Sequence, residues 1–248
     1  MDEYFNTKQP KVRQGDSKKE IFVLIFFAVI TSVLWQFQIG IYILYPFTIL
    51  GTWFHEMSHG LAAMALGGDF RKLELFWDGS GIATHSGGLF LGGIGNAIVA
   101  AAGPLGPAIF GSIIIVSTKS QKLTRFFLYF LSILMLLSVL IWIRTLFGII
   151  IISLMGIGIF FAAKKISENK QKLFLQFLGI QAISSIYLSI GYLYSSGAEI
   201  EGAGYYSDTQ VIQNNLFLPY WFWATAILIF SAIIMIISLR SVYLKEKS

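Results

Sequence analysis

Long apolar runs separated by short polar stretches make up most of this chain. A membrane-spanning helix needs about 20 consecutive, mostly apolar residues, and seven segments come close to that length. They lie at 21–38, 43–66, 90–117, 125–143, 146–163, 173–194 and 218–239. The pattern predicts an all-α polytopic membrane protein with six to seven transmembrane helices.

Two intervals depart from this pattern. Residues 70–77 and 82–85 are short, partly alternating runs on either side of an Asp78-Gly79 turn, which is typical of a β-hairpin. We therefore expect a small hairpin directly after the second apolar segment. Residues 195–217 contain no Lys or Arg and are expected to form one long polar loop.

The composition excludes a soluble enzyme. Hydrophobic residues make up 56% of the 248 residues and charged residues only 12%, whereas soluble domains contain roughly 25% charged residues. The chain has no cysteine, so disulfides, thiolate metal sites and cysteine nucleophiles are excluded. A metal ion would have to be held by His, Asp or Glu, and there are only three histidines.

The distribution of charged residues indicates how the chain is oriented in the membrane and does not indicate nucleic-acid binding. The formal charge of +5 is expected to lie in loops that face the cytoplasm and contact lipid headgroups. Basic residues gather at 119–125, 164–172 and 240–247, which places loop 195–217 on the outer side. Counting back through seven spans puts the lysine-containing N-terminal tail outside as well. Either one of the first three segments is re-entrant or broken, or the tail, whose charges nearly cancel, is a weak topology signal.

The same pattern suggests one membrane domain with two polar ends. We expect a polar tail over residues 1–20, which lacks the apolar stretch and cleavage site of a signal peptide. A single membrane-embedded domain is predicted over 21–240, followed by a basic tail over 241–248. The sequence gives no indication of oligomeric state.

The strongest chemical signal is the motif His55-Glu56-Met57-Ser58-His59 in the second apolar segment. On a helix, His55 and His59 lie one turn apart and face the same way, which suits two ligands of one tetrahedral Zn²⁺. Glu56 lies beside them and is expected to act as general base on zinc-activated water. Ionisable residues at membrane depth are costly, which favours a functional site.

A zinc site of this type needs a third protein ligand, and the residues leave three choices. Asp78 is most simply a turn residue, and His85 ends the predicted hairpin. Asp208 lies in the polar loop, where Ser207 and Gln210 have the spacing of a helix capping box. Chemistry alone does not choose among these residues.

The third apolar segment contains Gly103-Pro104-Leu105-Gly106-Pro107, which we expect to break the helix. Broken helices occur at membrane depth where they line a cavity or are buried in protein. This segment could wall the active site, with Asn96 offering its amide to the substrate or to a developing oxyanion. A simple packing kink is the alternative.

Together these pieces resemble the site-2 protease family of membrane-embedded zinc metalloproteases, in particular its bacterial-type branch. The likeness runs from about residue 43 to 239. It rests on the H-E-x-x-H motif with the pieces that follow it in order: Gly67-Gly68, Asp78–Gly81, 101–107, Arg144 with Phe147-Gly148, Ser207-Asp208 and 219–223.

The resemblance implies Zn²⁺ as cofactor and Asp208 as third metal ligand. It also implies a membrane-protein or peptide substrate and a multi-pass location, in a prokaryotic cell membrane. Better-known members take the third ligand from an Asp within a later membrane helix, and no later predicted span contains one.

Two other functions are open at this point. One is a non-hydrolytic metal-binding membrane protein, such as a transporter or assembly factor, which would have no obvious use for Glu56. The other is a prenyl-protein type protease, which would need a Glu ligand in a later helix, whereas Glu168, Glu199 and Glu201 lie outside the predicted spans.

Overall fold

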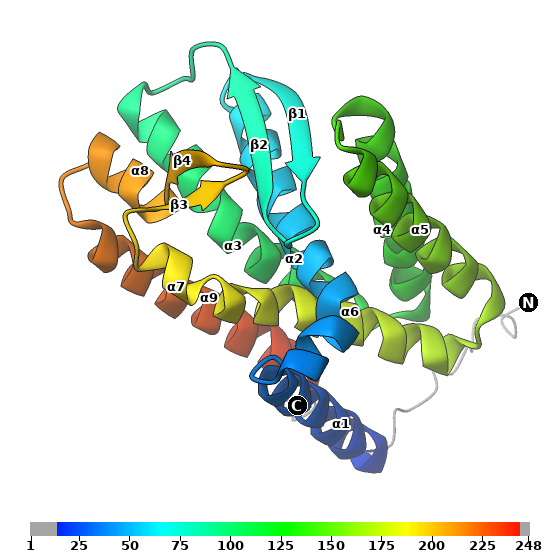
Figure 1. Cartoon of the computed structure of the whole chain (residues 1–248). Coiled ribbons are helices and arrows are strands. Elements are labelled where there is room, and N and C mark those ends of the chain that lie inside the picture. Colours follow the sequence, from blue (N-terminus) through cyan, green and yellow to red (C-terminus); the bar gives the residue numbers. More distant parts are fainter. Residues whose placement is uncertain (1–13, 244–248) are drawn as a thin grey trace, which may run out of the picture.

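The computed structural model describes residues 14–243 and consists mainly of helices, with two small strand pairs (Figure 1). The helices are α1 Gln14–Leu34, α2 Gln38–Ala65, α3 Gly93–Ser117, α4 Gln121–Ile141, α5 Leu146–Lys165, α6 Glu168–Leu188, α7 Ile190–Leu193, α8 Asp208–Asn215 and α9 Tyr220–Tyr243. The strands are β1 Asp69–Leu75, β2 Gly81–Ser86, β3 Gly197–Ile200 and β4 Ala203–Tyr206.

Among the described residues, four helices are long and apolar enough to cross a membrane, namely α3, α4, α5 and α9. Helices α1 and α2 meet the same criterion only together and are bent by 120°, which makes up to five spans. The predicted count of six to seven is therefore not confirmed. Helix α6, expected as a span over 173–194, carries the buried glutamines Gln171, Gln176 and Gln181.

The predicted tails lie mostly outside the described residues. Residues 1–13 and 244–248 belong to the tails expected at 1–20 and 241–248. In the described part, residues 14–20 form the start of α1, and α9 continues to Tyr243.

Helix α2 is the centre of the main core. Its residues Ile49, Leu50, Trp53, Phe54 and Met57 are almost fully buried and lie on one face at helical spacing. This face belongs to a cluster that also includes side chains of β1, α4, α5 and α6, and the indole Nε1 of Trp53 donates a hydrogen bond to Ser138 Oγ at 3.0 Å. The tight packing fixes the helix that carries the H-E-x-x-H motif.

The predicted hairpin is confirmed as the antiparallel pair β1–β2. On its other side β1 bonds to the turn between α4 and α5. The Leu73 N–H donates to the Trp142 carbonyl at 2.9 Å, and the Arg144 N–H donates to the Leu73 carbonyl at 3.0 Å. Strand β1 is thus paired along both edges, whereas the outer edge of β2 faces α2 and the site.

The expectation of a single polar loop over 195–217 is wrong. The segment folds into the hairpin β3–β4, with register from Gly197↔Tyr206 to Ile200↔Ala203, followed by helix α8. Strands of four residues are too short for an alternating pattern to stand out, which explains why the sequence did not reveal them.

The expected break at Gly103–Pro107 is also wrong, because α3 is helical through Pro104 and Pro107. Each proline removes one helix hydrogen bond. Helix α3 packs against α2, α6, α8 and α9, and this central position in the bundle offsets the loss. The segment still lines the site, as described below.

Candidate metal centre

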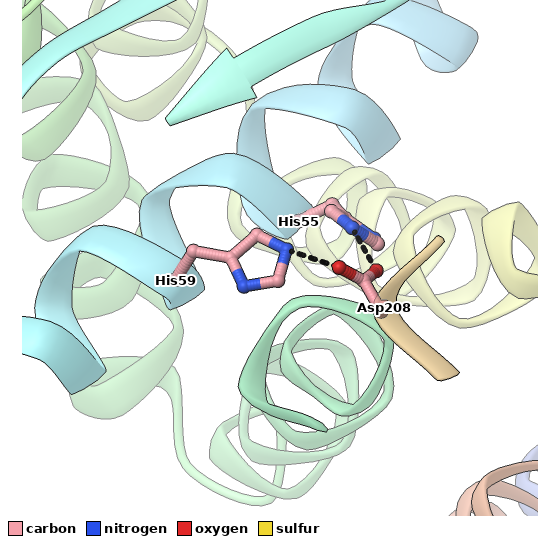
Figure 2. A group of neighbouring side chains, drawn as sticks. All are labelled: His55, His59 and Asp208. Atoms are coloured by element: carbon pink, nitrogen blue, oxygen red, sulfur yellow. Dashed lines mark ion pairs between the residues drawn. The ribbon is translucent and has the colours of Figure 1, made fainter. Parts of the chain in front are cut away.

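Three side chains from two distant parts of the chain converge on one point. His55 and His59 project from one face of α2, and Asp208 is the first residue of α8 (Figure 2). His55 Nε2 lies 3.0 Å from Asp208 Oδ2, and His59 Nε2 lies 3.2 Å from Asp208 Oδ1. All three potential ligand atoms lie within 4.8 Å of one another, so this group could hold a metal ion.

Helix α8 is anchored so that its first residue faces α2. Ser207 is the N-cap, and its hydroxyl accepts a hydrogen bond from the Gln210 N–H at 3.2 Å. The Thr209 hydroxyl donates to the Leu193 carbonyl at 2.6 Å. The predicted capping role of Ser207 and the predicted position of Asp208 are therefore compatible, because the cap holds the carboxylate toward the imidazoles.

The hydrogen bond of His59 fixes which ring nitrogen is free. Its Nδ1 lies 2.7 Å from the Val99 carbonyl oxygen, which can only accept, so Nδ1 carries the proton. Nε2 then points at the Asp208 carboxylate, where it either donates a proton to an oxygen of Asp208 or, when deprotonated, offers a lone pair to a metal ion. A backbone carbonyl on the distal nitrogen is a typical support of a metal-bound histidine.

Helix α3 approaches the histidines closely because residue 103 has no side chain. A Cβ at Gly103 would lie 2.1 Å from His59 Nε2 and 2.8 Å from His55 Nε2. The space in front of both ligand nitrogens is thus kept clear by a glycine. The site leaves room for an ion where a side chain would otherwise lie.

The electrostatics of Asp208 favour its ionised form. Burial alone would raise the pKa of this carboxyl, but the neighbouring His59 and His55 outweigh burial and lower it below its usual range. The Asp208 Oδ2 atom is buried and receives no hydrogen bond, although His55 Nε2 is 3.0 Å away. A buried carboxylate oxygen without a donor fits a metal ligand.

Glu56 lies next to the three residues without belonging to the group of ligands. Its carboxylate is buried, and Oε2 accepts a hydrogen bond from the backbone N–H of Ala83 in β2 at 2.7 Å. A Cβ at Gly81 would lie 2.9 Å from Glu56 Cγ, so β2 runs directly over this side chain. The carboxylate is held in place by the strand rather than by a cation.

Two cavities meet at His55 and Glu56. One, of about 350 Å³, lies between the start of β2 and β3 and is bordered by Pro104 and Pro107 of α3. The other, of about 340 Å³, also contains His59 and Asp208 and extends toward β4. The expectation that the proline segment walls the site is therefore confirmed, although the helix is unbroken.

The other sequence candidates have different positions. Asp78 is a turn residue, since its Oδ1 accepts hydrogen bonds from Ser80 N–H and Oγ at 2.8 and 2.7 Å. His85 lines the second cavity but is not in the ligand group, and its pKa is lowered by burial and by His59. Asn96 lines the same cavity, where its amide donates to Asn215 Oδ1 at 3.3 Å, and its catalytic role stays a prediction.

Tyr192 of α7 also lines both cavities, although nothing in the sequence indicates that it lies there. Burial, followed by the negative charges of Asp208 and Glu56, raises the pKa of its hydroxyl, and the Asp208 backbone amide acts in the opposite direction. No motif contains this tyrosine, so only the fold reveals it.

A comparison with protein families agrees with this site. A family model described as Peptidase M50B-like matches residues 22–238. The chain belongs to this family. The match indicates a membrane metalloprotease and confirms the resemblance to site-2 proteases. No curated protein and no solved structure matches the chain.

Proposed function

We propose that the chain is an intramembrane zinc metalloendopeptidase that hydrolyses a peptide bond of a membrane-associated protein or peptide. The observation that carries this proposal is the convergence of His55, His59 and Asp208 beside Glu56, at the junction of two cavities. A metal-binding transporter would need the three ligands, but it would have no use for a carboxylate positioned beside them.

The residues present fit a catalytic zinc site, which has three protein ligands and one open position. A bound zinc ion would supply Lewis-acid chemistry, polarising a peptide carbonyl and making water more acidic. Glu56 is placed to accept the proton of the attacking water and to pass it to the leaving amine nitrogen. The Ala83 N–H keeps this carboxylate oriented between the two proton transfers.

A transmembrane substrate must unwind locally, because its helix hides the peptide bonds in its own hydrogen bonds. Strand β2 offers a binding edge for such an unwound segment. The backbone N–H of Ala83 points toward Glu56 and away from β1, and Gly81 and His85 share this side of the strand. An extended segment between β2 and the β3–β4 hairpin would therefore pass the three ligands.

The test uses protein purified in detergent with one equivalent of zinc and β-casein, an unfolded substrate that needs no unwinding. We expect cleavage by the unaltered chain, measured by gel electrophoresis with fragment ends identified by mass spectrometry. Glu56→Gln should bind zinc but lose cleavage by at least about 100-fold, because an amide cannot accept the proton.

Two results would overturn the proposal. One is a zinc-loaded, folded protein that leaves both casein and co-purified membrane proteins intact, which would favour a non-hydrolytic metal-binding protein. The other is equal cleavage by Glu56→Gln, which would assign the activity to a contaminating protease.

A further inference from the structure

Tyr192 lies where the two cavities join. It belongs to the single-turn helix α7 and, like His55 and Glu56, lines both cavities. One of these cavities is also lined by His59 and Asp208, so the side chain of Tyr192 borders the same space as the three possible ligands. It does so from the wall that also carries β3, β4 and α8.

The Tyr192 hydroxyl has a proton that is only weakly engaged. Its hydrogen bond goes to the Tyr206 backbone carbonyl at 3.4 Å, which is at the long end of the usual range. By contrast, Tyr194, two residues further on, forms a 2.7 Å bond with Thr225 Oγ1. A weakly bound O–H can turn toward a substrate atom at little cost.

Hydrolysis creates a need for such a donor. When water adds to the peptide carbonyl, a C–O bond forms, Glu56 takes the water proton, and negative charge develops on the carbonyl oxygen. When the C–N bond breaks, the charge returns to the carbonyl and the proton passes to the amine. Glu56 cannot stabilise the oxygen, because its carboxylate is itself negative and is held by β2 on the other side of the cleft.

Resting on the function proposed above, we infer that Tyr192 is a catalytic residue that donates a hydrogen bond to the carbonyl oxygen of the scissile peptide. The phenol keeps its proton throughout the reaction and strengthens this hydrogen bond as charge develops. Asn96 is less suited to the role, since it lines only one of the two cavities and its amide bonds to Asn215.

The test compares Tyr192→Phe with the matched control Tyr194→Phe, since each variant loses one phenolic hydroxyl. On β-casein, Tyr192→Phe should lower kcat by about 100-fold while KM changes by less than twofold, because the bond forms mainly in the transition state. Tyr194→Phe should keep the kcat of the unaltered chain. Zinc content should equal one per chain in all three proteins.

A binding measurement gives a second readout that does not depend on turnover. A peptide spanning one casein cleavage site is compared with the same peptide carrying a phosphonate at the scissile bond, which resembles the transition state. Tyr192→Phe should weaken binding of the phosphonate by at least about 10-fold. The unmodified peptide should bind the double variant Glu56→Gln/Tyr192→Phe as tightly as it binds the single variant Glu56→Gln.

The outcomes separate this inference from the proposed function. Unchanged kcat and phosphonate binding in Tyr192→Phe, with Glu56-dependent cleavage by the unaltered chain, would overturn the inference alone. A loss of zinc in Tyr192→Phe would also overturn it, because the tyrosine would then only position Asp208. Absence of Glu56-dependent cleavage by the unaltered chain would overturn the proposed function and this inference with it.

Discussion

At the scale of single residues, the backbone carbonyl of Val99 determines how His59 can act. Because this carbonyl takes the Nδ1 proton, Nε2 is left to face Asp208. The H-E-x-x-H spacing is sufficient to predict His55, Glu56 and His59, since a helix alone brings them together. Asp208 needed a family resemblance, and Val99 and Tyr192 could not be predicted, because any residue can supply a carbonyl and tyrosines are common throughout this chain.

The choice of Asp208 over Asp78 as third ligand is directly testable. Asp208→Asn should weaken zinc binding by at least about 100-fold, because changing even an outer partner of a ligand costs about 10- to 100-fold. Asp78→Asn is the matched control and should leave zinc affinity unchanged, since Asp78 only closes a turn. Competition with a chelator measures both affinities, and the opposite ranking would make Asp78 the ligand.

The glycine at position 103 gives a second prediction. Gly103→Ala should reduce zinc occupancy and cleavage together, because the added Cβ would collide with the ligand nitrogens of both histidines. Gly158→Ala in α5 is the control, since nothing lies within 4 Å of a Cβ there. Zinc analysis and the thermal midpoint of both variants distinguish a local effect from misfolding. Full zinc occupancy in Gly103→Ala would contradict the close approach of α3.

At the scale of elements, the sequence predicted what depends on local pattern and missed what depends on packing. The Asp-Gly turn between alternating runs revealed β1–β2. The proline segment suggested a break, but packing of α3 against its neighbouring helices maintains the helix. The short strands β3 and β4 left no periodic signal. Their fold nevertheless matters most for function, because it leads into α8 and so carries Asp208 to the histidines.

The cap of α8 should therefore influence the metal. Ser207→Ala removes a side-chain cap worth about 1 kcal/mol, and we expect zinc affinity to fall about fivefold as the first turn of α8 loosens. Ser167→Ala is the matched control, since Ser167 is the N-cap of α6 but makes no side-chain cap bond. Titration of zinc against a chelator measures both. Equal affinities would show that Asp208 does not depend on its cap.

At the scale of the whole molecule, the basic clusters at 119–125 and 164–172 lie away from the site. Helices α4 and α5 lie side by side, and the turn between them is bonded to β1, whereas the two clusters lie at the start of α4 and between α5 and α6 (Figure 1). Cavity residues lie near the C-terminal end of α6, such as Ser185 and Ser189, whereas its lysines lie near the start. The bend between α1 and α2 supplies a broken segment, which is one of the two explanations that the charge pattern left open.

The positive-inside rule then predicts that the cleft opens away from the cytoplasm. Because the chain has no cysteine, single cysteines can report this. In intact cells, a membrane-impermeant maleimide should label Glu201→Cys at the β3–β4 turn, and should label Lys119→Cys only after the membrane is opened. The reverse pattern would place the cleft on the cytoplasmic side.

The zinc content of the unaltered chain and of Glu56→Gln, after purification in detergent without chelator, tests the proposed metal site most directly. We expect one zinc ion per chain in both proteins, because His55, His59 and Asp208 form the group that could hold a metal ion and Glu56 lies outside it. A zinc content near zero in the folded, unaltered chain would contradict the metal site. Loss of zinc in Glu56→Gln alone would make Glu56 a ligand and contradict its role as general base.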